Sequence, residues 1–207
     1  MTYDFDTPVD RSGTYSLKWE EAGDALPMWV ADMEFQTAPQ IRAALQQRLD
    51  HGIFGYSIVP PAWNQAYVDW WHRRHNLDID PESLVFSTGV VPAISSMVRK
   101  LTTANENVLI QTPVYNVFFN SIINNGCRVL ESPLEYDGSG HYSINWADLE
   151  SKLADPQTTL MILCNPHNPV GRIWDRDTLA RIGELCWNHH VTVISDEIHC
   201  DLTDPGY

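Results

Sequence analysis

Basic residues are scarce in this sequence. It contains 13 lysines and arginines against 27 aspartates and glutamates, and its formal net charge is −14 over 207 residues. Such an excess of negative charge repels phosphate backbones and leaves no basic stripe that could release counterions. We therefore expect neither nucleic acid nor a membrane surface as a partner.

Long apolar runs are also absent. No stretch approaches the roughly 18 apolar residues that a membrane span needs. The first residues, Met1-Thr-Tyr-Asp-Phe-Asp, do not join a basic start to an apolar run, as a signal peptide would. The sequence thus predicts a cytoplasmic protein.

Cysteine is sparse, and its four positions form no CxxC pair. This spacing predicts buried free thiols in a reducing compartment. Two groups, Cys186-Trp-Asn-His-His190 and His199-Cys-Asp201, raise the alternative of a zinc site. Neither group has a second half that would complete four ligands, so we expect no metal.

Hydrophobic residues make up 43% of the sequence and aromatic residues 11%, which is enough apolar area for a packed core. Five short runs have the composition of strands that are buried on both faces. These runs are 84–87, 107–111, 127–130, 159–164 and 191–195. Apolar residues at helical spacing predict helices over 92–101 and 114–123, and two more that begin after the caps Asn145 and Asp175. This alternation predicts an α/β fold with a mostly parallel sheet covered by helices on both faces.

The N-terminal part differs in kind. Residues 1–36 show no sustained periodicity, which predicts an extended arm. Two helices follow, one over about 37–49 that ends at Gly52 and one that begins at Pro61. We divide the chain into an N-terminal arm with its first helix, 1–50, and a main domain, 51–207.

Ligands of an open parallel sheet lie at the carboxyl ends of its strands, so the segments after the predicted strands are of interest. Thr88-Gly-Val-Val-Pro92 opens a predicted helix, where free backbone N–H groups suit a phosphate. Thr112-Pro-Val-Tyr115 brings an aromatic ring to the same edge. On these facts alone, an ordinary turn and a core aromatic residue remain alternatives.

Two further segments are more unusual. Asn165-Pro-His-Asn-Pro-Val-Gly171 contains two Asn-Pro pairs, and the prolines hold the loop extended so that the Asn168 amide has a defined direction. Asp196 ends the last apolar run, where a carboxylate loses solvation unless it faces a cation or a donor. Asp196 is therefore either paired or functional.

In this order, the four segments resemble the large domain of fold-type I pyridoxal-phosphate enzymes, the aspartate-aminotransferase superfamily. The resemblance narrows to the cystathionine β-lyase-like C–S lyases, a subgroup that includes the maltose-regulon modulator proteins. It is carried by Pro27-Met-Trp-Val-Ala-Asp-Met-Glu-Phe35, Gly52-Ile-Phe-Gly-Tyr-Ser57, Thr112-Pro-Val-Tyr115 and Ser195-Asp-Glu-Ile-His-Cys-Asp201, and it runs from about Asp4 to Tyr207. The resemblance implies that 1–50 belongs to the small domain and that 51–207 is an incomplete domain for pyridoxal 5'-phosphate.

The resemblance also implies roles around the cofactor. Asp196 would hold the proton on the pyridine nitrogen, so that the ring accepts electrons from the substrate Cα. Asn168 would donate to the ring oxygen, with His199 nearby, and Tyr115 would stack on the ring. The residues implied in cofactor binding are Gly89, Val90, Val91, Tyr115, Asn168, Asp196, His199 and Tyr56.

Three residues of the N-terminal part receive roles in the same way. Tyr56 corresponds to a catalytic-site tyrosine that reaches the phosphate from the partner subunit, which implies a homodimer. Ala31 and Asp32 lie where the arm of the family closes over the substrate. The implied catalytic residues within this sequence are Asp196 and Tyr56.

The lysine that carries the Schiff base in the family has no counterpart here. The lysines of the sequence are Lys18, Lys100 and Lys152, and none stands in a matching segment. The small-domain arginine for the substrate carboxylate is missing as well. We therefore expect this sequence to be the N-terminal part of a longer enzyme and to be inactive alone.

The resemblance implies that the full-length protein is a β-lyase. Its reaction would be α,β-elimination of cystathionine or cysteine S-conjugates to pyruvate, ammonia and a thiol. Two alternatives remain open, a class I/II aminotransferase of amino acids and a non-catalytic binding role, because some members of the family bind a transcription regulator.

Overall fold

The computed structural model describes residues 3–204, so that Met1 and Tyr207, the ends named above, lie outside the described residues. The contacts group the chain into two compact units, Met1–Trp63 and Asn64–Tyr207. The division falls inside the helix α3, Pro61–His75. This grouping does not test the domain boundary at residue 50, which stays a prediction.

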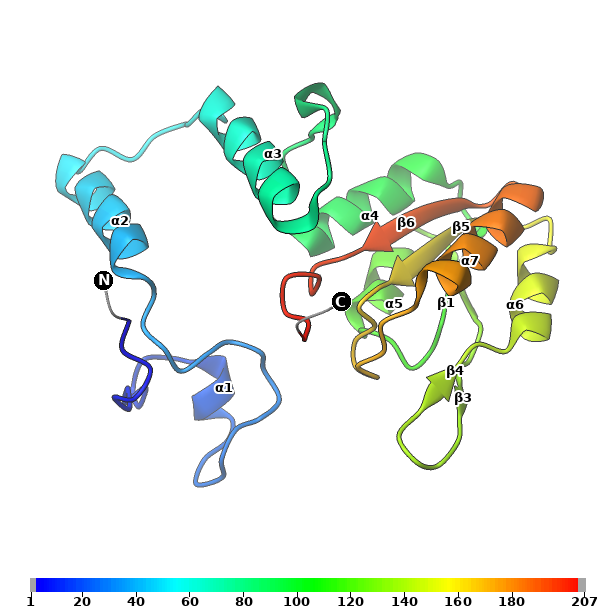
Figure 1. Ribbon diagram of the computed structural model, residues 1–207, viewed down its shortest axis with the longest axis horizontal. Helices are drawn as coiled ribbons and strands as arrows, with labels where there is room; N and C mark the ends of the chain where they lie inside the picture. Colours follow the sequence, from blue (N-terminus) through cyan, green and yellow to red (C-terminus); the bar gives the residue numbers. More distant parts are fainter. Residues whose placement is uncertain (1–2, 205–207) are drawn as a thin grey trace. The chain divides into compact units, whose positions relative to one another are not determined.

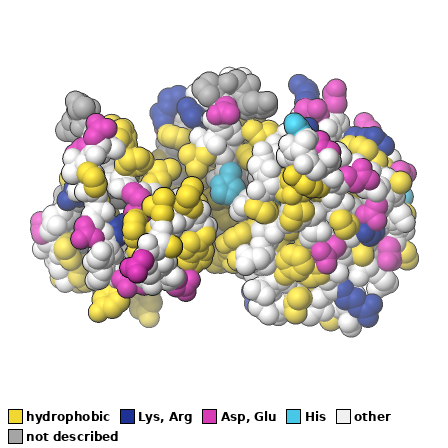
Figure 2. Space-filling view, turned by 90° about the horizontal axis from the view of Figure 1, so that it is seen from below, with side chains coloured by type: hydrophobic (Ala, Val, Ile, Leu, Met, Phe, Trp, Pro, Cys, Tyr) yellow, Lys and Arg dark blue, Asp and Glu magenta, His cyan; other side chains and the backbone are white. Residues whose placement is uncertain are grey.

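The first unit contains the short helix α1, Leu17–Glu20, and the helix α2, Pro39–His51. α2 begins with a proline in its first turn and ends at Gly52, whose left-handed φ of 73° favours glycine. The apolar side chains of α2 that recur at helical spacing, Ile41, Leu45 and Leu49, are all exposed. Hydrophobic side chains are visible at many places on the molecular surface (Figure 2).

The second unit is built on a parallel sheet of four strands (Figure 1). The strands are β1 Asn107–Ile110, β2 Arg128–Glu131, β5 Thr158–Cys164 and β6 Thr192–Asp196, in the spatial order β2-β1-β5-β6. A small antiparallel hairpin, β3 Glu135–Tyr136 with β4 Tyr142–Ser143, follows β2 in the chain. The predicted parallel sheet is thus confirmed.

Helices cover both faces of this sheet. α4, Val90–Leu101, and α5, Val117–Ile123, pack on one face, and α6, Trp146–Leu153, and α7, Arg176–Asn188, pack on the other. Successive side chains of β5 alternate between the two cores, since Leu160 and Ile162 join the first and Met161 and Leu163 the second. The predicted α/β fold is confirmed.

The two predicted caps are present. The Asn145 side chain accepts a hydrogen bond from the backbone N–H of Asp148 at 3.0 Å, and Asp175 accepts from Thr178 at 2.8 Å. Each cap satisfies one of the backbone donors that the first turn of a helix leaves free. The sequence therefore predicted the beginnings of α6 and α7 correctly.

Two predicted elements differ from the structure. The run 84–87 follows the short 3₁₀ helix Pro81–Ser83 and is not a strand, because no strand within residues 3–204 pairs with it. Val85 is correspondingly 87% exposed. The helix predicted over 114–123 begins only at Val117, since Thr112 and Pro113 form a bend and Val114 and Tyr115 are in irregular structure.

The longest helix of the described residues is α3, with 15 residues. No helix within residues 3–204 is both long enough and apolar enough to cross a membrane.

Candidate functional site

The order of the strands places a topological switch point between β1 and β5. β1 lies between β2 and β5, and the helix that follows β1 packs on one face of the sheet while the helix that follows β5 packs on the other. The chain therefore leaves the two neighbouring strands in opposite directions, and open parallel sheets bind ligands at the carboxyl ends of the strands at such a point. The segments Thr112–Tyr115 and Asn165–Gly171, both singled out in the sequence, follow these two strands.

His167 joins the two segments. Its ring is 2% exposed, and Nε2 lies 3.0 Å from the carbonyl oxygen of Pro113, so Nε2 carries the proton and donates. Burial lowers the pKa of His167, which favours this neutral form. The His167 backbone bonds to Arg172 and Gly171 close the loop, and Gly171 adopts a left-handed φ of 68° that favours glycine. Sequence reasoning missed His167, although its place between two Asn-Pro pairs was a signal.

The two asparagines of the loop have different surroundings. The Asn165 side chain accepts a hydrogen bond from the backbone N–H of Trp174 at 3.0 Å, so it shapes the loop itself. Within residues 3–204, the Asn168 amide makes no hydrogen bond, and its donors are free. Asn168 and His199 both line a cavity of about 340 Å³. The full lining is Pro166, His167, Asn168, Pro169, Gly171, Ile173, His199, Leu202, Thr203 and Asp204.

Asp196 ends β6 beside Cys164 of β5 and is 5% exposed. Its Oδ1 accepts one hydrogen bond, from the backbone N–H of Ile198 at 3.1 Å, and no side chain of the described residues donates to it. Burial raises the pKa of Asp196, while the hydrogen bond from the backbone of Ile198 acts in the opposite direction. A buried carboxyl group of this kind fits a cationic ligand atom, because such a partner offsets the lost solvation.

The N-terminus of α4 offers free backbone donors. Its N-cap is Gly89, which has no side chain to cap the helix, and the N–H of Ala93 bonds back to the carbonyl oxygen of Gly89. The N–H groups of Val90 and Val91 therefore lack a partner within the helix, and they lie at the positive end of the helix dipole. This arrangement fits a phosphate group.

Tyr115 is 37% exposed and lies in the segment that follows β1, at the switch point. Its ring meets Phe118 of α5 edge to face, with centroids 5.9 Å apart. Phe118 is buried in the core beneath the sheet, so the core supports the Tyr115 ring from one side.

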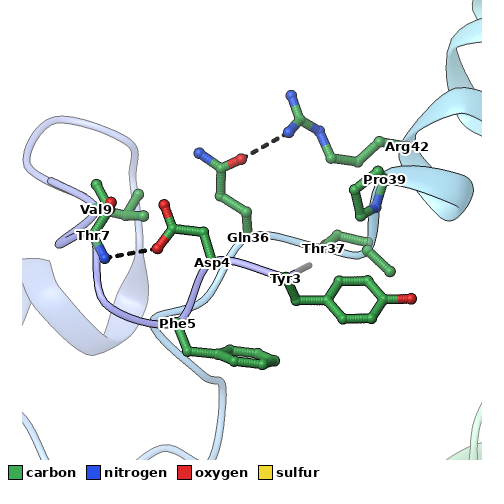
Figure 3. Close-up of a pocket in the computed structure, with 10 residues that line it drawn as sticks. Tyr3, Asp4, Phe5, Thr7, Val9, Gln36, Thr37, Pro39 and Arg42 are labelled. Atoms are coloured by element: carbon green, nitrogen blue, oxygen red, sulfur yellow. Dashed lines mark hydrogen bonds between the residues drawn. The ribbon is translucent and has the colours of Figure 1, made fainter. Parts of the chain in front are cut away.

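Ala31, Asp32 and Tyr56 belong to the first unit. Tyr56 is fully exposed, and Ile53, Phe54 and Ile58 beside it are also exposed. A cavity of about 430 Å³ in this unit includes none of these residues (Figure 3). It is lined by Tyr3, Asp4, Phe5, Thr7, Val9, Gln36, Thr37, Ala38, Pro39 and Arg42.

Two of the three lysines are engaged in ion pairs. Lys18 Nζ lies 2.7 Å from Glu34 Oε1, and Lys152 Nζ lies 2.8 Å from Asp148 Oδ1. Lys100 stands near the far end of α4, about 15 Å along the helix from Val90 at 1.5 Å per residue. That none of the three corresponds to the Schiff-base lysine of the family stays a prediction.

The cysteines are free thiols. Burial raises the pKa values of Cys164 and Cys186 to about 11, so both remain protonated at neutral pH. Cys127 is also buried, whereas Cys200 is only partly buried. The prediction of buried free thiols is thus confirmed for three of the four cysteines.

One group of residues has metal-ligating side chains close together. The ligand atoms of His75, Cys200 and Asp201 lie within 4.8 Å of one another. Asp201, however, accepts hydrogen bonds from His75 Nε2 at 2.7 Å and Trp70 Nε1 at 3.1 Å, and Arg74 Nε lies 3.7 Å from it. These hydrogen bonds to Asp201 explain why the side chains lie close together. The positive charge of the Arg74 guanidinium group would also repel a metal ion.

We therefore predict that the purified full-length protein holds no stoichiometric zinc or iron. Elemental analysis after dialysis against a chelator should find less than about one tenth of an equivalent of either metal, because a three-ligand site beside a guanidinium is weak. The variant Cys200→Ser, which removes the strongest zinc ligand of the cluster, is the control and should give the same result. One equivalent of zinc that survives the chelator, and is lost in Cys200→Ser, would contradict this prediction.

Comparisons with known proteins give a consistent picture. The family model "Aminotransferase class I and II" matches residues 27–205. The chain is 49% identical over 210 residues to the cystathionine beta-lyase PatB of Bacillus subtilis, a match that covers 98% of this chain and 54% of PatB.

Two solved structures are similar over the whole chain. Cystalysin from Treponema denticola, which contains a pyridoxal 5'-phosphate cofactor, superimposes with a TM-score of 0.92 at 36% identity, covering 100% of this chain and 54% of cystalysin. The PLP-bound C-S lyase from Staphylococcus hominis gives a TM-score of 0.91 at 33% identity, with the same coverage of 100% and 54%. The chain thus spans about half the length of the proteins it matches.

Proposed function

This chain belongs to the aminotransferase class I and II family. From that premise we propose that it is part of a pyridoxal-phosphate-dependent C–S β-lyase. The substrates would be amino-acid thioethers, cystathionine or cysteine S-conjugates, cleaved to pyruvate, ammonia and a thiol. The observation that carries the proposal is the buried Asp196 carboxyl group at the end of β6, to which no cationic side chain of the described residues bonds. The similarity to PatB and to a C–S lyase favours elimination within the family.

The residues of the second unit fit the proposed cofactor. When bound, pyridoxal phosphate supplies a sink for the electron pair that remains after the substrate loses its Cα proton. Asp196 holds a proton on the pyridine nitrogen, and Asn168 donates its free amide to the ring oxygen. The N–H groups of Val90 and Val91 bind the phosphate at the positive end of α4. Tyr115, supported by Phe118, packs against the ring.

Transamination is the second candidate, because an aminotransferase uses the same cofactor contacts. The two reactions differ in product, since elimination releases pyruvate and ammonia from a thioether with water as the only other reactant, whereas transamination requires a 2-oxo acid. The full-length protein should release pyruvate and a thiol from cystathionine when pyridoxal phosphate is the only addition. Turnover that depends on a 2-oxo acid would support the aminotransferase, and an absence of both reactions would support a binding role.

The proposal includes a homodimer. Tyr56 and its exposed apolar neighbours Ile53, Phe54 and Ile58 form a surface that a second copy would cover. The Tyr56 hydroxyl of one copy would then reach the phosphate in the site of the other. The arm at 1–50, the main domain at 51–207 and a cytoplasmic location are parts of the same proposal.

We predict that Asn168→Ala weakens cofactor binding in the full-length protein. A hydrogen bond to a charged group contributes about 1.5–3 kcal/mol, so the affinity for pyridoxal phosphate should fall roughly ten- to a hundredfold. The ring oxygen also loses its donor, so the pH titration of the cofactor absorbance should shift. Equilibrium dialysis and absorbance titration measure the two effects.

The matched control is Asn124→Ala, which removes an exposed asparagine at the end of α5. It should change neither the affinity nor the titration. Equal results for the two variants would contradict the role of Asn168.

A further inference from the structure

The segment that carries Ala31 and Asp32 has no backbone support of its own. In the part of the chain that the structure describes, Ala25 and Ala38 are the nearest residues on either side with a hydrogen bond between two backbone groups. The residues between them lie outside every helix and strand. Such a segment keeps one conformation only where side chains hold it.

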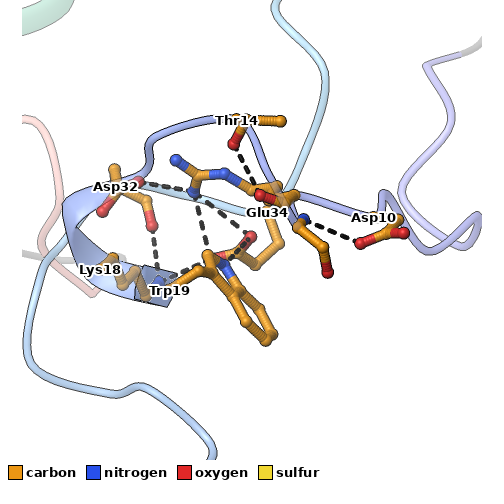
Figure 4. Close-up of polar contacts among 8 residues, drawn as sticks. Asp10, Thr14, Lys18, Trp19, Asp32 and Glu34 are labelled. Carbon is orange, nitrogen blue, oxygen red and sulfur yellow. Dashed lines mark hydrogen bonds and ion pairs between the residues drawn. The ribbon is translucent and has the colours of Figure 1, made fainter. Parts of the chain in front are cut away.

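Side chains from residues 11–19 provide this support (Figure 4). Lys18 Nζ donates to Glu34 Oε1 at 2.7 Å, and Trp19 Nε1 donates to Glu34 Oε2 at 3.0 Å. Arg11 Nη1 lies 3.3 Å from Glu34 Oε2 and 2.6 Å from Asp32 Oδ2. Glu34 is therefore the acceptor on which three donors from an earlier part of the chain converge.

Asp32 is held at both its side chain and its main chain. Arg11 binds its carboxylate, and Lys18 Nζ donates to its backbone carbonyl oxygen at 2.9 Å. The bond to the carbonyl restrains the peptide group itself, which a bond to the side chain alone would not do. Lys18 thus connects Glu34 with the backbone of Asp32.

The charges of this cluster balance, with two cations facing two carboxylates. The hydrogen bond from Lys18, followed by those from Trp19 and Arg11, lowers the pKa of Glu34, so that Glu34 stays ionised. The Lys18 side chain is 10% exposed and the Glu34 side chain 35% exposed, so solvent partly screens their ion pair. The contact is therefore present throughout the neutral pH range.

We propose that Lys18 and Glu34 are positioning residues for substrate binding, which hold the Ala31–Asp32 segment in the conformation that receives the substrate. This inference rests on the proposed function and on the family resemblance, which implies that Ala31 and Asp32 belong to the arm that closes over the substrate. The proposed cofactor contacts lie on α4 and on the segments after β1, β5 and β6. Loss of the Lys18–Glu34 contact should therefore weaken substrate binding and leave cofactor binding intact.

The kinetic test is Lys18→Met in the full-length protein, which keeps the length of the side chain and removes its donors. The KM for cystathionine should rise about tenfold, which corresponds to about 1.4 kcal/mol, while kcat changes by less than about threefold. The cofactor absorbance and affinity should stay at the wild-type values. Lys18→Arg, which retains a donor, should recover most of the affinity, and Lys100→Met on α4 should have no effect.

Hydrogen exchange provides a second test that does not depend on catalysis. In Lys18→Met and in Glu34→Gln, exchange should become faster at residues 28–36 and stay unchanged in β1. Unchanged exchange at 28–36, or an unchanged KM, would overturn the inference. A parallel loss of cofactor and substrate binding would also overturn it, since it would indicate general destabilisation. A wild-type protein that binds no pyridoxal phosphate would contradict the proposed function, whereas the exchange result reports on the contact alone.

Discussion

Asp196→Asn in the full-length protein is expected to retain pyridoxal phosphate and to lower kcat for pyruvate release by roughly 10²- to 10³-fold, the range seen when one stabilising group is removed from a catalytic site. The substituted amide has nearly the shape of the carboxyl group, so binding survives. An amide carries no charge, however, and cannot hold the proton on the pyridine nitrogen. The electron pair at the substrate Cα then loses its stabilisation.

The surroundings of Asp196 make this effect specific. The side chain is buried, and within the described residues its one hydrogen bond comes from the backbone of Ile198. No neighbouring acid can replace it, because Glu197 is exposed and bonded to Ser195. Glu197→Gln is therefore the matched control, and single-turnover and steady-state assays of both variants provide the measurement. Elimination by Asp196→Asn at a rate within threefold of the wild type would contradict the assignment.

The central strands of the sheet could be predicted from the sequence because β1 and β5 are buried on both faces. The run 160–164 is apolar throughout, a pattern that is typical of a strand between two layers of helices. The caps at Asn145 and Asp175 could also be predicted, because each is a local contact between residues three positions apart. The run 84–87 has the same composition but no partner strand within residues 3–204, and pairing is not a local property.

Part of the candidate site could be predicted because its residues follow strands that could themselves be predicted. The positions of Asn168 and Asp196 follow from the ends of their strands. The difference between Asn165 and Asn168 did not follow, because it depends on a bond from Trp174 to one of them. The bond of His167 to Pro113 likewise spans 54 positions and becomes visible only when β1 and β5 are neighbours.

The contacts at Glu34, in the first unit, also could not be predicted, because they join residues that are far apart in the sequence. Residues 1–36 have no periodicity, so the sequence predicted only an extended arm. The structure shows that Lys18 and Trp19 bond to Glu34 from 16 and 15 positions away. Order in this segment comes from polar side chains and not from an apolar pattern, which is why hydropathy does not detect it.

Phe118→Ala should have the largest effect on stability. Phe118 lies on α5, is 1% exposed and belongs to the core between α4, α5 and the sheet. Truncation of a buried phenylalanine removes apolar contacts and leaves a cavity, at a cost of about 3–5 kcal/mol. The same change withdraws the edge contact that supports Tyr115. We therefore expect unfolding at lower temperature together with weaker cofactor binding.

Ile123→Ala is the control for this prediction. Ile123 lies on the same helix but is 58% exposed, so its truncation removes little buried area and should change stability by less than about 1 kcal/mol. Chemical denaturation of the full-length protein, followed by tryptophan fluorescence, compares the two variants. If Phe118→Ala unfolds at the same denaturant concentration as Ile123→Ala, the core assigned to α4, α5 and the sheet does not carry the stability of this unit. If Phe118→Ala is destabilised but binds pyridoxal phosphate with unchanged affinity, Tyr115 does not depend on Phe118 for its position.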